Sequence, residues 1–221
     1  MNPTDGKPQV TQVMAALAAG NSSTRLAAAM AAGTHPDPAL LETLVRRCAV
    51  EPDFFVRDML TWALTRLPAD RTVPRLRTEL ESARPQARSQ ALHTLSKIGD
   101  KSVWPAITRA LLQDADDEVA RSAWRAAVAL VPEGQEAALA AELATQFGRG
   151  DREVQRSLSR AFVALGAAVE PVLHAAMNNG EANRRAHARA TEQLLRDPEA
   201  GFDLAVAEAK RVVALGPDRK E

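Results

Sequence analysis

Residues 119–130 read VARSAWRAAVAL, and residues 154–165 read VQRSLSRAFVAL. The two stretches share the pattern V-x-R-S-x-x-R-A-x-V-A-L, with eight of twelve positions identical at an offset of 35 residues. In both stretches apolar residues recur at i, i+4, i+7, i+8 and i+11. They form one stripe along a helix, because side chains three and four positions apart share a face. The pattern therefore predicts a repeated helix that is buried on one side.

The same frame fits residues 56–67 and 87–98, and a second helix follows each first one. The second helices begin with Val and Pro, as in VPRLRTEL from Val73, VWPAITRALL from Val103 and VEPVLHAAM from Val169. One hairpin of about 32 residues cannot bury both of its apolar faces, so neighbouring hairpins must stack. We therefore expect an all-α fold, an α-solenoid of about six stacked helical hairpins with terminal capping helices.

Proline and glycine mark the expected ends of the helices. Prolines fall at or just inside helix starts (Pro38, Pro74, Pro105, Pro171 and Pro198), and glycines fall just past helix ends (Gly33, Gly99, Gly148, Gly166 and Gly180). Thirteen helices and no strand are predicted: 9–19, 22–32, 38–49, 54–67, 71–83, 85–98, 102–114, 117–131, 133–147, 151–165, 167–179, 181–195 and 199–215.

These helices predict one domain over residues 9–215, with disordered tails at 1–8 and 216–221. The repeats are expected near 22–49, 54–83, 85–114, 117–147, 151–179 and 181–215. Helices 9–19 and 199–215 are expected to cap the two ends, because the terminal repeats of a solenoid face water on one side.

Residues 114–130, DADDEVARSAWRAAVAL, resemble the acidic turn, the V-x-R and the Ala-rich first helix of the short, bacterial, phycobiliprotein-lyase-like variety of HEAT repeat. The resemblance covers roughly residues 22–195. It implies an α-solenoid and says little about function, since related arrays serve as scaffolds, lyase subunits, hydroxylases and DNA-repair enzymes. A chaperone for a bound chromophore is suggested only by the name of the repeat.

Composition narrows the class of protein. The chain has 28 basic and 28 acidic side chains, and this balance argues against a general polyanion binder. Residues 1–8 lack a secretory pattern, and no apolar run is long enough to span a membrane. A single Cys48, expected to be buried, builds no disulfide framework, so the cytoplasm is the expected location. The 44 Ala, and 23 Arg against 5 Lys, are typical of a GC-rich bacterial genome.

The sequence contains no recognisable catalytic or metal-binding motif. His35, His93, His174 and His187 are followed by Pro, Thr, Ala and Ala, so the paired His-Glu sets of HEAT-like di-iron hydroxylases are missing. No phosphate-binding loop or nucleophile elbow is present either. We therefore expect no catalytic residues, no metal and no cofactor, and we predict a non-catalytic scaffold.

The alternative is a DNA-repair protein that resembles the HEAT-like alkylpurine DNA glycosylases. Trp62, Trp104 and Trp124 are candidates for the aromatic pocket of that family. In the family an Asp follows the Trp by one helical turn, whereas Arg66, Thr108 and Val128 stand there in this chain. Trp62 and Trp124 are expected in the core, and Trp104 is expected to be partly exposed.

Each first helix also carries an arginine near its start. Acidic residues precede four of these arginines by four or five positions (Asp53, Asp117, Asp151 and Glu181) and are expected to cap the helix or pair with the arginine. A structural ladder is the favoured interpretation, and an anion-binding row is the alternative. The ladder comprises Arg25, Arg57, Arg88, Arg121, Arg156 and Arg185.

The two halves differ in charge, with +4 over residues 1–110 and −4 over residues 111–221. Second helices line the concave side of HEAT-like arrays, so these charges are consistent with a bipolar groove for a protein or peptide partner, and an ordinary mixed surface is the equal alternative. The expected contacts are chosen from helix position: Arg75, Thr78, Arg109, Gln113, Gln146, His174 and Asn178.

Overall fold

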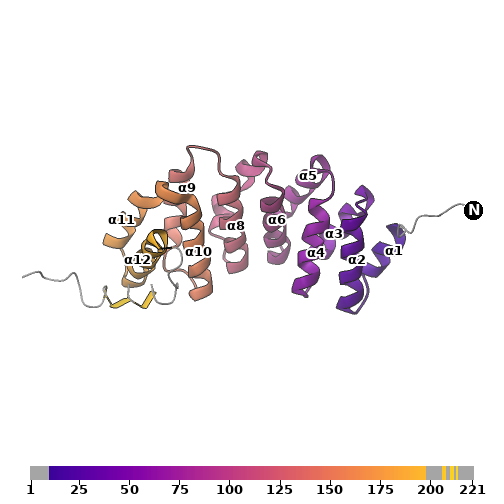
Figure 1. Ribbon diagram of the computed structural model, residues 1–221, viewed down its shortest axis with the longest axis horizontal. Coiled ribbons are helices and arrows are strands. Elements are labelled where there is room, and N and C mark those ends of the chain that lie inside the picture. Colours follow the sequence, from indigo (N-terminus) through magenta and orange to yellow (C-terminus); the bar gives the residue numbers. More distant parts are fainter. Residues whose placement is uncertain (1–9, 198–205, 208–209, 212, 214–221) are drawn as a thin grey trace, which may run out of the picture. The chain divides into compact units, whose positions relative to one another are not determined.

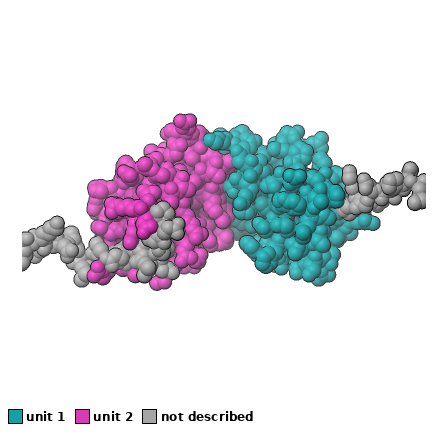
Figure 2. Space-filling view, viewed as in Figure 1, with its two compact units in different colours: residues 1–106 teal, residues 107–221 magenta. Residues whose placement is uncertain are grey.

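The protein is all-α, as predicted (Figure 1). The computed structural model describes residues 10–197, 206–207, 210–211 and 213, and within them it has helices and no strand. These residues belong to two compact units, residues 1–106 and 107–221 (Figure 2). The division falls inside the third expected hairpin, 85–114. One domain over 9–215 stays a prediction.

Unit 1 consists of stacked helical hairpins. The first helices α2, α4 and α6 follow one another, with α2 packed on α4 and α4 on α6. The elements are α1 (Val10–Leu17), α2 (Ser22–Thr34), η1 (Pro38–Leu40), α3 (Leu41–Cys48), α4 (Phe54–Thr65), α5 (Ala69–Glu79), α6 (Pro85–Ile98) and η2 (Lys101–Ala106).

Unit 2 repeats the arrangement. The first helices α8, α10 and α12 pack in that order. The elements are α7 (Arg109–Leu112), α8 (Asp117–Leu130), α9 (Glu136–Leu143), η3 (Ala144–Gln146), α10 (Arg152–Leu165), η4 (Gly166–Val169), α11 (Glu170–Asn178) and α12 (Ala182–Arg196).

The core follows the frame that the sequence predicted. All five frame positions are buried in α8 and α10, from Val119 to Leu130 and from Val154 to Leu165. The same holds from Val56 to Leu67, where Leu67 lies just past the end of α4. Trp124 is fully buried and donates from its indole Nε1 to the Leu112 carbonyl at 2.9 Å. The expected stripe and the expected core position of Trp124 are therefore confirmed.

Aspartates fix the starts of three first helices. Asp53, Asp116 and Asp151 each accept hydrogen bonds from the backbone N–H groups two and three residues later. The cap of α8 is thus Asp116, and not Asp117 as the Arg spacing suggested. Asp117 instead accepts a hydrogen bond from Arg149 at 2.9 Å, which ties the turn before α10 to the start of α8.

Several boundaries differ from the prediction, and the expected helix 133–147 is α9 followed by η3. Residues 102–114 form η2 and the short α7 rather than one helix, because Pro105 donates no backbone hydrogen bond and Thr108 caps a new helix at Leu111 N–H. Pro74 lies in the middle of α5, which begins at Ala69. Gly33 lies within α2 and does not end it.

The expected caps are described in part. Helix 9–19 is α1, whereas most of 199–215 and both tails lie outside the described residues. Val206 is buried against Ala186, Ala190 and Leu194 of α12, and Val213 packs on the same cluster. These contacts are those expected of a closing helix.

By length and composition, the stretch Arg152–Asn178 could cross a membrane. In the fold it is α10, η4 and α11, and Gly166 ends α10 with φ 68°. Leu158, Phe162 and Leu173 are buried in unit 2. Core packing therefore accounts for its apolar side chains.

Candidate protein interface

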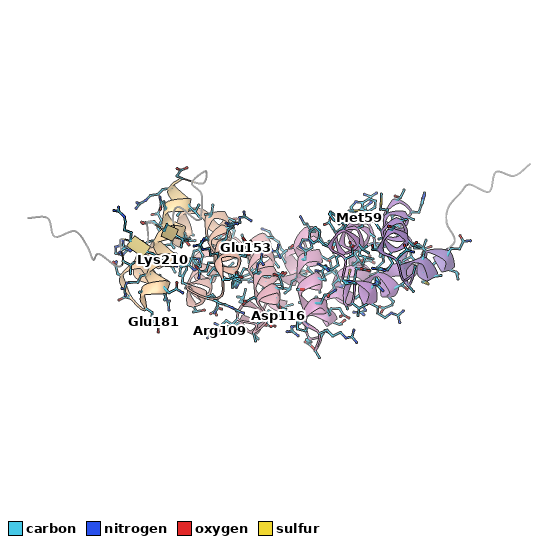
Figure 3. All side chains as sticks on the ribbon, turned by 90° about the horizontal axis from the view of Figure 1, so that it is seen from below. Met59, Arg109, Asp116, Glu153, Glu181 and Lys210 are labelled. Carbon is cyan, nitrogen blue, oxygen red and sulfur yellow. The ribbon has the colours of Figure 1, made fainter. Side chains whose placement is uncertain are left out.

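The large apolar side chains that remain exposed in the described residues are concentrated in one part of unit 1. They are Met30, Val50, Phe54, Phe55 and Trp62, with exposed fractions from 38% to 70%. Phe55, the half-buried Met59 and Trp62 share one side of α4, because they stand four and seven positions apart. Met30 lies on the adjacent α2. We name Met30, Phe54, Phe55, Met59 and Trp62 the α2–α4 apolar face (Figure 3 labels Met59).

Gly33 determines how Trp62 lies on this face. A Cβ atom at Gly33 would lie 2.2 Å from Cζ3 of Trp62, so the indole ring rests directly on the glycine backbone. Met30 precedes Gly33 by three positions and therefore lies on the same side of α2. The structure thus corrects two predictions. Trp62 is not a core residue, and Gly33 serves as a seat for an aromatic ring rather than as a helix end.

The start of α4 positions the two phenylalanines. Asp53 caps the helix by accepting from Phe55 N–H, and the rings of Phe54 and Phe55 meet edge to face at 5.6 Å. Arg57 lies 5.9 Å from the centre of the Phe54 ring, within the range of a cation–π contact. Phe54 and Phe55 are 65% and 70% exposed, so most of this aromatic surface faces solvent.

Of the six arginines in the predicted ladder, Arg25 is the most deeply buried. Arg25 donates from Nε and Nη2 to both carboxylate oxygens of Glu51 at 2.7 and 2.8 Å, and Glu51 is fully buried. Arg47 and the backbone N–H of Asp53 also donate to Glu51. Burial alone would raise the pKa of Glu51, but these hydrogen bonds outweigh it and lower the pKa to about 2.

The other ladder members make two kinds of contact. Arg57, Arg88 and Arg185 donate to carbonyl oxygens five or six residues earlier, in the turn that precedes their own helix. Arg121 and Arg156 pair with Glu118 and Glu153, one turn before them. Arg25 likewise donates to the carbonyl oxygens of Ala19 and Gly20. Arg25, Arg57, Arg88 and Arg185 therefore share the contact with the preceding turn, and the ladder as a whole stays a prediction.

Two of the predicted partner contacts lie on α5 in unit 1. Arg75 forms ion pairs with Glu42 and Glu79, both at 2.7 Å, and Thr78 accepts a hydrogen bond from Arg75. Arg75 is therefore engaged within its own unit, whereas Thr78 is exposed.

The remaining five predicted contacts lie in unit 2, in two groups. Arg109 and Gln113 share the carboxylate of Glu142, and Gln146 accepts from Arg149. On α11, Asn178 donates to the His174 carbonyl at 3.0 Å. Their role in binding stays a prediction.

The remaining candidates for chemistry are buried or scattered. Burial raises the pKa of the Cys48 thiol to about 12, which makes it unreactive, and its predicted burial is confirmed. Trp124 cannot stack on a base because it is fully buried, while Trp104 is half-buried, as expected. In the part of the chain that the structure describes, no three His, Cys, Asp or Glu side chains gather as a metal site would require.

Comparison with known proteins supports the repeat. The family model for HEAT repeats matches residues 51–129. A comparison with curated protein sequences gives no significant match. Among solved structures, the complex of CpcE and CpcF of phycocyanin lyase from Nostoc sp. PCC7120 is similar, with 20% identity, a TM-score of 0.48, and coverage of 94% of this chain and 90% of that one.

One expectation from the sequence needs correction after this comparison. We expected a protein without enzymatic activity, because the chain carries no catalytic motif. The similar complex is that of a lyase, which is an enzyme. That finding overturns the exclusion of enzymatic activity.

Proposed function

We propose that this chain is a HEAT-repeat protein, as the family match over residues 51–129 indicates, and that it binds a protein partner through the α2–α4 apolar face. One observation carries the proposal. Four of the five large apolar side chains exposed in the described residues, Met30, Phe54, Phe55 and Trp62, belong to this face. Exposed apolar patches of this kind mark interaction sites, and aromatic side chains are enriched among the residues that dominate binding.

The chemistry of the face suits a partner that offers apolar side chains. Phe54 and Phe55 present aromatic surface, Met30 and Met59 present flexible thioethers, and Trp62 adds an indole ring on Gly33. Methionine adapts to irregular partner surfaces, whereas the aromatic rings are rigid anchors. We place this binding in the cytoplasm, because Cys48 is a free thiol.

Affinity capture with matched variants tests the proposal. The immobilised protein is exposed to native lysate with and without nuclease, alongside M30E/F55E and T78E. Met30 and Phe55 are half or more exposed, and Thr78 is exposed on α5. Both variants are therefore expected to melt like the wild type.

We expect a discrete protein that survives nuclease, is lost with M30E/F55E, and is retained by T78E. Retention by M30E/F55E would overturn the proposal. Loss with T78E alone would move the interface to the second helices, where Arg75 and Thr78 were predicted to act. Capture that disappears with nuclease would indicate a nucleic-acid ligand instead.

A further inference from the structure

The repeat frame places arginines at two equivalent positions on every first helix of unit 2. The frame starts at Val119 in α8, at Val154 in α10 and at Asn183 in α12. Two and six residues after each start stands an arginine: Arg121 and Arg125, Arg156 and Arg160, and Arg185 and Arg189. In α4 these positions hold Asp58 and Trp62, and in α6 they hold Ser89 and His93. The paired arginines are thus not required by the repeat itself.

Between α8 and α10 the paired arginines line a groove of about 260 Å³, which we name the arginine groove. Four of its lining residues are Arg121, Arg125, Arg156 and Arg160. Toward the C-terminal ends of both helices the lining becomes aliphatic, with Val128, Ala129, Ala161 and Ala164. Glu153, labelled in Figure 3, lies at the opposite end beside Ser157. The groove therefore combines a cationic end with an apolar one.

The two arginines of each pair differ in their charge partners. Arg121 pairs with Glu118 at 2.6 Å and Arg156 with Glu153 at 2.9 Å. Arg125 donates only to the hydroxyl of Ser122, and neither Arg125 nor Arg160 forms an ion pair with a carboxylate in the described residues. The Nε of Arg121 is buried and lacks a hydrogen-bond partner.

These contacts leave positive charge uncompensated in the groove. Although the Arg125 side chain is exposed, desolvation of its guanidinium in the groove, and then the neighbouring charge of Arg121, lower its pKa. Like charges held together in this way cost stability, and such an arrangement is typical of a site that waits for an anion. A bound carboxylate would supply the missing charge and accept hydrogen bonds from the planar guanidinium groups.

We propose that the arginine groove binds an acidic segment of a protein, with its carboxylates on Arg125 and Arg160 and its aliphatic side chains over Val128 and Ala161. Two observations favour a peptide over a nucleic-acid backbone. Glu153 lies inside the groove and would repel a continuous row of phosphates, and the aliphatic end offers nothing to a sugar-phosphate chain. The site does not depend on the α2–α4 apolar face, so either proposal can fail alone.

Fluorescence anisotropy with the full chain tests this site. The probe is a short, labelled synthetic peptide that carries glutamates on one helical face and leucines on the other. The control is the same peptide with every glutamate replaced by glutamine. We expect R125Q/R160Q to weaken binding of the glutamate peptide at least about tenfold. R71Q/R77Q removes two exposed arginines from α5 in unit 1 and should leave binding unchanged.

A charge reversal separates recognition from folding. R125E/R160E should lose the glutamate peptide and bind a lysine version, while R125Q/R160Q should melt no lower than the wild type. The proposal is overturned if the glutamate peptide does not bind the wild type, or if the glutamine peptide or R125Q/R160Q binds equally well. It is also overturned if inorganic polyphosphate or duplex DNA binds more tightly through the same two arginines.

Discussion

Glu51 accepts hydrogen bonds from Arg25, Arg47 and a backbone N–H without any exposure to water. Breaking a buried ion pair from one side leaves an uncompensated charge and costs about 3–5 kcal/mol. Arg121 pairs with Glu118, whose side chain is 65% exposed, and such surface pairs contribute about 0.2–1 kcal/mol. We therefore expect Arg25→Ala to lower the free energy of unfolding far more than Arg121→Ala. Equal losses of unfolding free energy for the two variants, measured by urea titration, would show that the arginines contribute alike, as a uniform ladder predicts.

The sequence located these arginines but could not rank them. Spacing along the chain gives the helix face on which an arginine lies, whereas its burial depends on which loop packs against it. Arg25 meets Glu51, which lies 26 residues away and has no motif of its own. The second arginine of each pair, Arg125 and Arg160, was visible in the shared V-x-R-S-x-x-R pattern. That both residues line the same groove between α8 and α10 is visible only in the structure.

At the scale of a helix pair, the contact of Gly33 with Trp62 reverses the usual effect of a glycine substitution. Alanine in place of a helical glycine normally stabilises by about 1 kcal/mol. At Gly33 the added methyl would overlap the Trp62 ring, so Gly33→Ala should lower the melting temperature. In the Trp62→Ala background the clash is gone, and Gly33→Ala should raise it. A double-mutant cycle by thermal unfolding measures both signs, and the same sign in both backgrounds would exclude direct packing.

The sequence predicted helices correctly where apolar periodicity, capping residues and packing all favour the same helix. The frame from Val119 to Leu130 is buried throughout, because apolar periodicity, the Asp116 cap and stacking all favour the same helix. Residues 102–114 show where they disagree, because Pro105 and the Thr108 cap break a pattern that hydrophobicity alone would continue. The exposed Phe54 and Phe55 were assigned no role, since exposure of an aromatic residue depends on tertiary neighbours rather than on composition.

Across the whole molecule, net charge is a poor guide to where anions bind. The half with charge −4 contains the arginine groove, while the half with charge +4 has Arg25 and Arg75 engaged by carboxylates. Counting charges treats every side chain as free, whereas some arginines, such as Arg25 and Arg75, are compensated by carboxylates of their own unit. The bipolar groove on the second helices therefore stays a prediction, because a sum of charges does not report which of them are available.

The two units should lose stability in different pH ranges, because each buries a different titratable group. In unit 2, His187 is 1% exposed, its Nδ1 accepts from Gly148 N–H, and its Nε2 lies 3.0 Å from the Gln155 carbonyl. A second proton would have to sit on Nδ1, facing that N–H donor. Burial lowers the pKa of His187 from 6.5 to about 4.

The neutral ring of His187 thus contributes fully to the free energy of unfolding of unit 2 above pH 6.5. About 3 kcal/mol of that contribution is lost as the pH falls from 6.5 to 4. The ionised Glu51 stabilises unit 1 above pH 4.5, and its contribution is lost only between 4.5 and about 2. Amide exchange, corrected for intrinsic rates, should therefore accelerate in α10 and α12 between pH 7 and 5 while α4 stays protected. His187→Gln should remove that difference between the two pH values. Equal acceleration in α4 would show that His187 does not control the first step.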